Sequence, residues 1–122
     1  MALPSSDDEI LLLHNPKCSK SRATLALLEE RGVDFETRLY LEAPLDEAEL
    51  RALGERLGRA PIDFTRTKQA EFAEAGRSKD ADDDAILAAM AKTPILMERP
   101  VVVRGSRAAI GRPPEDVLAL LD

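Results

Sequence analysis

Cys18, the only cysteine of the chain, lies in a polar segment that carries several positive charges. The segment His14–Arg22 reads HNPKCSKSR, with an apolar run from Ile10 to Leu13 before it and a helical pattern from roughly Ser21 to Glu30 after it. A cysteine at such a strand-to-helix turn lies where the first, unpaired N–H groups of the helix point, and these groups with the helix dipole stabilise a thiolate and bind anions. Cys18 is therefore predicted to be an exposed nucleophile, in preference to the small buried hydrophobe that many lone cysteines are.

The reactions open to Cys18 are limited because the chain has no second cysteine. Oxidoreductases with a Cys-x-x-Cys pair attack with one thiol and resolve the intermediate with the other. Here the second position is Ser21, so a redox cycle must take its resolving thiol from another molecule, or Cys18 performs no redox chemistry. His14, the only histidine, can lower the thiol pKa by charge or hydrogen bond, or can brace the turn.

Three arginines in separate segments, each beside a turn, are candidates for binding an anion: Arg66, Arg99 and Arg112. A guanidinium group stays charged and donates paired hydrogen bonds in one plane, which suits a tetrahedral oxyanion. Arg99 leads into the apolar segment 101–103 and is expected to point from the edge of the core toward a cleft. The alternative is that each arginine is a solvated surface charge, and composition alone does not decide.

The hydrophobic pattern predicts the order β-α-β, then a helical stretch of about fifty residues, then β-β-α. The predicted strands are Ile10 to Leu13, Val33 to Tyr40 with Val33, Phe35, Thr37 and Leu39 on one face, Val101–Val103 and Ala108–Ile110. The predicted helices are roughly 21–30, Asp46 to Leu57 with Gly58 as its stop, roughly 68–75, one capped by Asp82 or Asp83 and ending at Thr93-Pro94, and Pro114 to Leu121.

Length and composition describe a soluble protein of one domain. The 122 residues are 44% apolar and 33% charged, and no apolar run approaches the roughly 20 residues that cross a bilayer. A formal net charge of −6 argues against binding to nucleic acid or to a membrane surface. The N-terminal segment has no signal-peptide pattern, so the cytoplasm is the expected location, and no exposed apolar surface demands a dimer, so a monomer is expected.

The predicted order is that of the thioredoxin-like fold with helices inserted in its middle. In such folds the active thiol follows the first strand, and a cis-proline before the third strand packs near the sulfur. Arg99-Pro100 occupies that position in this sequence.

Four segments in order along the chain resemble the glutaredoxin-linked arsenate reductase family: HNPKCSKSR at 14–22, LYLE at 39–42, PILMERPVV at 94–102 and IGRP at 110–113. The resemblance spans nearly the whole chain. It implies a single α/β domain, 1–122, with a thioredoxin-like mixed sheet and a helical insertion at about 43–93. The implied activity is reduction of arsenate to arsenite, a step of arsenic detoxification, with glutathione as co-substrate and glutaredoxin as protein partner.

The same resemblance assigns roles to individual residues. It makes Cys18 the nucleophile that forms a thiol–arsenate adduct and His14 the histidine that tunes this thiol. The oxyanion would be bound by Arg99, Arg112 and, through the looser motif RTK, Arg66, while Pro100 and Ser21 would be structural residues near the site. No metal and no tightly bound organic cofactor is expected.

Two other functions fit the same fold. One is a regulator that binds RNA polymerase and senses oxidation through a Cys-x-x-Cys pair, although Ser21 in place of the second cysteine argues against an internal disulfide switch. The other is an enzyme that acts on another oxyanion or on a glutathione mixed disulfide.

Overall fold

The chain forms two compact units in a computed structural model that describes residues 3–75 and 81–121. Unit 1 comprises Met1–Ala43 and Arg99–Asp122, and unit 2 comprises Pro44–Glu98. The helical insertion was expected at about 43–93, and residues 76–80 of it lie outside the described residues. The single domain over 1–122 stays a prediction. In the described part of the chain, no helix is both long and apolar enough to cross a membrane.

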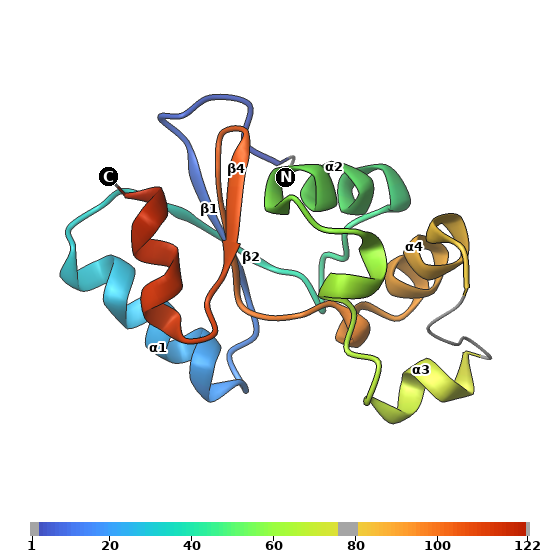
Figure 1. The fold of residues 1–122 in the computed structure, drawn as a ribbon. Helices are drawn as coiled ribbons and strands as arrows, with labels where there is room; N and C mark the ends of the chain where they lie inside the picture. The colour runs from blue at the N-terminus through green and yellow to red at the C-terminus, as the bar shows by residue number, and fades with distance from the viewer. Residues whose placement is uncertain (1–2, 76–80, 122) are drawn as a thin grey trace. The chain divides into compact units, whose positions relative to one another are not determined.

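Unit 1 is built on a four-stranded mixed sheet with the strand order β2-β1-β3-β4 (Figure 1). The strands are β1 (Ile10–His14), β2 (Glu36–Leu39), β3 (Val101–Arg104) and β4 (Arg107–Ile110). β1 runs parallel to β2 and antiparallel to β3, and β3 runs antiparallel to β4. This is the predicted α/β, thioredoxin-like order, and the fold prediction is confirmed.

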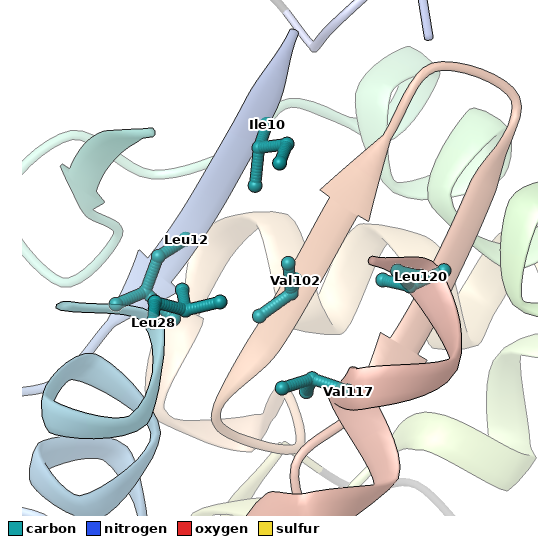
Figure 2. Close-up of a cluster of buried hydrophobic side chains, with 6 residues drawn as sticks. All are labelled: Ile10, Leu12, Leu28, Val102, Val117 and Leu120. Carbon is teal, nitrogen blue, oxygen red and sulfur yellow. The ribbon is translucent and has the colours of Figure 1, made fainter. Parts of the chain in front are cut away.

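One face of this sheet is covered by helix α1 (Ser19–Glu30) and the C-terminal 3₁₀ helix η3 (Pro114–Leu120), which pack side by side (Figure 1). The buried cluster between sheet and helices consists of Ile10, Leu12, Leu28, Val102, Val117 and Leu120, shown in Figure 2. Every residue of β1 is buried, as expected for a continuous apolar run in a central strand. Burial of this apolar surface therefore holds α1 in place against the sheet.

The strand register brings three loops to one edge of the sheet. Leu13, next to the end of β1, is opposite Val101, the first residue of β3. Val101 is in turn opposite Ile110, the last residue of β4. The loop after β1, the chain before β3 and the chain after β4 therefore meet, and these segments contain Cys18, Arg99 and Arg112.

Unit 2 is helical in its described part. It contains α2 (Glu47–Leu57), η1 (Pro61–Phe64), α3 (Ala70–Glu74), α4 (Asp83–Lys92) and η2 (Pro94–Leu96). Asp46 and Glu49 form a capping box at the start of α2, and Gly58 ends this helix with a φ of 68°. Asp82 caps α4, so the side chains that predicted these helix boundaries do form the caps.

The prediction for the second strand was partly wrong. β2 is shorter than the predicted Val33 to Tyr40, and its buried residue is Arg38 while Thr37 is exposed. Pairing starts only at Glu36, because Val33 and Phe35 instead pack against the hydrophobic cluster before the strand begins. Arg38 can be buried because its Nε donates a hydrogen bond of 2.8 Å to the carbonyl oxygen of Ala43.

Two predicted helices also differ from the structure. The one expected at roughly 68–75 is only the five residues of α3. Pro61–Phe64, where no helix was predicted, forms the 3₁₀ helix η1. The predicted helix from Pro114 is a 3₁₀ helix that ends at Leu120.

Gly111 lets the chain after β4 pass close to α1. A Cβ atom there would lie 2.6 Å from Oγ1 of Thr24 and 2.8 Å from Cγ of Pro100. Gly111→Ala is therefore expected to lower the free energy of unfolding by about 1–3 kcal/mol, as measured by urea denaturation. The φ of Gly111 is not positive, so without this close approach alanine would stabilise the protein by about 0.4–1 kcal/mol. A stabilised variant would contradict the packing described here.

Candidate active site

Cys18 is the N-cap residue of α1, at the edge of the sheet where the three loops of unit 1 meet. Its backbone is extended, with φ −98° and ψ 125°, and its side chain is partly buried. Its N–H donates to the carbonyl oxygen of Asn15 at 3.0 Å, and the N–H of Lys17 donates to Oδ1 of Asn15 at 3.0 Å. Nη1 of Arg22 donates to the carbonyl oxygen of Pro16 at 2.9 Å. These bonds fix the loop that carries the sulfur.

Asn15 was not among the predicted site residues. Its side chain closes the turn by bonding the backbone two residues on, a frequent role of asparagine. The Asn-Pro pair at 15–16 is itself a turn signal, so the role could have been predicted.

The surroundings of Cys18 lower the pKa of its thiol. Partial burial raises this pKa, but the backbone N–H groups of Ser21 and Lys20 donate to the sulfur and lower it. The positive charges of Arg99 and Arg112 lower it further, and the net shift is downward. The sulfur therefore carries more thiolate at neutral pH than a free cysteine does.

Arg112 links two of the predicted site residues. Its Nη2 lies 3.7 Å from Sγ of Cys18, and its Nε donates a 2.7 Å hydrogen bond to the carbonyl oxygen of Arg99. The backbone of one arginine thus orients the guanidinium of the other toward the sulfur. Arg112 is exposed and Arg99 is partly buried, so an anion from solvent can reach this corner of unit 1.

The peptide bond between Arg99 and Pro100 is cis, as the position of this pair before the third strand led us to expect. Pro100 is buried, and its carbonyl oxygen accepts a 2.9 Å hydrogen bond from the N–H of Gly111. The bond between Arg112 and Pro113 is also cis, which the sequence analysis did not predict.

His14 lies against Ser21 at the end of β1. Its Nδ1 is 2.7 Å from Oγ of Ser21, which also accepts a 3.0 Å hydrogen bond from the N–H of Asn15. Burial and the nearby charge of Arg22 lower the pKa of His14, which favours the neutral ring. The short contact with Ser21 is consistent with a bracing role for His14. Ser21 is fully buried and joins the strand end to the first turn of α1.

We expect the Cys18 thiol to titrate below the value of about 8.5 for a free cysteine, and His14→Ala to raise that pKa. Removing the imidazole releases Ser21, whose backbone N–H donates to the sulfur. The absorbance of the thiolate against pH measures the effect, and the signal is unambiguous because the chain has one cysteine.

Ser19→Ala is the control for this titration. Ser19 is exposed, and its side chain is not among the groups that act on the sulfur, so this substitution should leave the thiol pKa unchanged. A wild-type value at or above 8.5 would contradict the activated thiol.

Arg66 lies in unit 2, in a short segment that pairs with the chain leading to Arg99. Thr65 forms an antiparallel bridge with Met97, and the N–H of Arg66 donates to the carbonyl oxygen of Leu96 at 2.6 Å. Nη1 of Arg66 donates to the carbonyl oxygen of Ile95 at 3.2 Å. Its role as the third anion-binding arginine stays a prediction.

The structure therefore brings most of the predicted site residues together at one end of unit 1: His14, Cys18, Ser21, Arg99, Pro100 and Arg112. A thiolate beside two guanidinium groups and the N–H groups of a helix start can attack an electrophilic centre that carries negative charge. Among residues 3–75 and 81–121, no group of three or more His, Cys, Asp or Glu side chains could hold a metal ion.

Comparisons with known proteins show which family the chain matches. The family model described as "ArsC family" matches residues 13–120. A protein of Neisseria meningitidis named arsenate reductase is 45% identical over 115 residues, covering 93% of this chain and 98% of the relative. The Escherichia coli protein YfgD, named as uncharacterized, is 44% identical over 115 residues, covering 93% and 97%. A solved structure of an arsenate reductase from Vibrio cholerae has a TM-score of 0.86 and 42% identity, covering 96% of this chain and 99% of that one.

Proposed function

The chain belongs to the ArsC family, and on this premise we propose that it is an oxidoreductase that reduces arsenate to arsenite with Cys18 as nucleophile. The observation that carries the proposal is the position of the Arg112 guanidinium, 3.7 Å from the sulfur and oriented by Arg99. A thiolate needs such a neighbour if it is to approach an anion, because the two negative charges repel each other. The similarity to relatives named arsenate reductase supports arsenate as the substrate.

In the first step the Cys18 thiolate attacks the arsenic atom of arsenate. An S–As bond forms and an As–O bond breaks, and the oxygen leaves as water once it has been protonated. Arg99 and Arg112, together with the N–H groups at the start of α1, stabilise the negative charge on the remaining oxygens. Arg66 is proposed as a third arginine for the same anion, on the basis of the RTK motif.

In the second step the thiolate of glutathione attacks the sulfur of Cys18. An S–S bond forms, the S–As bond breaks, and its electron pair stays on arsenic, which leaves as arsenite, reduced by two electrons. Cys18 is then a mixed disulfide with glutathione. A thiol of glutaredoxin attacks the glutathione sulfur of this disulfide and releases the Cys18 thiolate, since the chain has no second cysteine to do so. No metal and no tightly bound cofactor takes part.

We further propose that the protein acts as a monomer in the cytoplasm, where glutathione keeps thiols reduced. Nucleic acid and membrane surfaces are not among its proposed partners, given its formal net charge of −6.

The proposal is tested by a coupled assay with arsenate, glutathione, glutathione reductase, glutaredoxin and NADPH. Arsenate-dependent oxidation of NADPH is expected, and it should stop when glutaredoxin is omitted. If the activity persists with thioredoxin as the only protein reductant, thioredoxin would take the place of glutaredoxin in the proposed reaction. No arsenate-dependent turnover with either reductant would remove the arsenate reductase function.

A further inference from the structure

Two lysines beside Cys18 have no role in the proposed reaction steps. Lys17 and Lys20 flank the cysteine in the chain, and both are exposed. The backbone N–H of Lys20 donates to the sulfur, so its ammonium group lies within about 10 Å of that atom, which is about the Debye length at 0.1 M salt. The charge of Lys20 is therefore close enough to act on a molecule that approaches Cys18, and Lys17 is the residue directly before Cys18 in the chain.

The segment around Cys18, residues 14–22, has a formal charge opposite in sign to that of the whole chain. Residues 14–22 contain two lysines, one arginine and no acidic residue, a formal charge of +3, whereas the whole chain has −6. The remaining residues therefore carry −9, which is −6 minus +3. The first turn of α1 also has no acidic side chain. An anionic molecule that most of the protein repels is attracted at this segment.

The proposed reaction needs two anions at one sulfur. Arg99 and Arg112 act on the sulfur itself, and the second is oriented by the backbone of the first, which suits them to hold the oxyanion. Glutathione carries two carboxylates and one ammonium group and must approach an adduct that is itself negative. It therefore needs positive charge outside the oxyanion site, and in unit 1 the exposed lysines adjoining Cys18 supply it.

We infer that Lys17 and Lys20 form the recognition site for the carboxylates of glutathione, an inference that rests on the proposed function. The lysines attract the anionic co-substrate and leave the oxyanion to the arginines. Attraction at this distance across water is screened by salt, so it should weaken as the ionic strength rises.

The experiment measures the reaction of Cys18 with two disulfides and needs no arsenate. In each case the Cys18 thiolate attacks one sulfur, an S–S bond to Cys18 forms, the original S–S bond breaks and a thiolate leaves. Oxidised glutathione is anionic, and 2-hydroxyethyl disulfide is neutral. The ratio of the two rate constants is independent of the thiolate fraction, so a shifted pKa does not change it.

The variant is Lys17→Gln with Lys20→Gln, and the control is Arg31→Gln with Arg107→Gln. Both pairs are exposed and remove two positive charges from unit 1. Arg31 follows the last residue of α1, about 18 Å along the helix from its start, and Arg107 begins β4, whose other end lies at the site. At low salt the lysine variant should lower the rate ratio about 3- to 10-fold, while the control changes it less than about 2-fold.

High salt should reduce the difference between wild type and lysine variant. An unchanged ratio in the lysine variant, or an equal fall in the control, would overturn the inference. In the coupled assay, the lysine variant should raise the KM for glutathione and leave the KM for arsenate unchanged. If wild type shows no arsenate turnover, the proposed function fails while the disulfide ratio still decides the role of the lysines.

Discussion

Replacing Cys18 with serine is expected to lower arsenate-dependent turnover by at least about 10³-fold, to the background of the coupled assay. A hydroxyl is a far weaker nucleophile than a thiolate at neutral pH. The substitution also removes the atom that accepts glutathione, because an oxygen in this position cannot be attacked to form a disulfide. Both chemical steps therefore fail, and no other cysteine in the chain can take over.

The fold should survive this substitution. Cys18 caps α1 through its backbone, and its N–H and carbonyl oxygen make their hydrogen bonds whichever side chain is present. The urea midpoint of Cys18→Ser should therefore match that of wild type, and mass spectrometry should detect a glutathione adduct on wild type alone. Turnover within tenfold of wild type would show that Cys18 is not the nucleophile.

The elements that the sequence predicted well depend on nearby residues. The apolar run Ile10–Leu13 indicated a strand buried on both faces, and β1 is buried throughout. Asp46 and Gly58 marked the two ends of α2, because a side-chain cap and a left-handed glycine act within one turn of the helix. Cys18 was expected at a strand-to-helix turn because an apolar run precedes it and a helical pattern follows it, and it is the N-cap residue of α1.

The features that the sequence did not predict depend on contacts that form only when the chain folds back on itself. Arg38 gave no local sign of its burial, since the carbonyl oxygen that satisfies it becomes available only when the following turn folds back. The contact of Gly111 with Thr24 joins residues that only the packing of α1 on the sheet brings together. The orientation of Arg112 by the backbone of Arg99 follows from the pairing of β3 with β4. The arginines in the sequence could suggest an anion site, but they could not show that the carbonyl oxygen of Arg99 accepts a hydrogen bond from the guanidinium of Arg112.

Replacing Arg112 with alanine should lower kcat/KM for arsenate by about 10²- to 10³-fold, the usual effect of removing one group that stabilises charge in a transition state. The same substitution should raise the pKa of Cys18, because it removes one of the charges that lower it. Arg112→Lys separates charge from geometry. A lysine keeps the charge but cannot bond the Arg99 carbonyl oxygen and an anion through one planar group, so we expect it to recover less than a tenth of the lost activity.

The matched control for Arg112 is Arg107→Ala, an exposed arginine at the opposite end of β4. In this control, kcat/KM should stay within twofold of the wild-type value, and the thiol pKa should equal that of wild type within experimental error. The reason is that Arg107 is not among the groups that act on the sulfur. If Arg112→Ala raised the thiol pKa and left kcat/KM for arsenate unchanged, Arg112 would only activate the thiol and would not hold the substrate. If both properties stayed at wild-type values, the position of this guanidinium 3.7 Å from the sulfur would not be functional. The two measurements therefore distinguish an arginine that prepares the nucleophile from one that also binds the oxyanion.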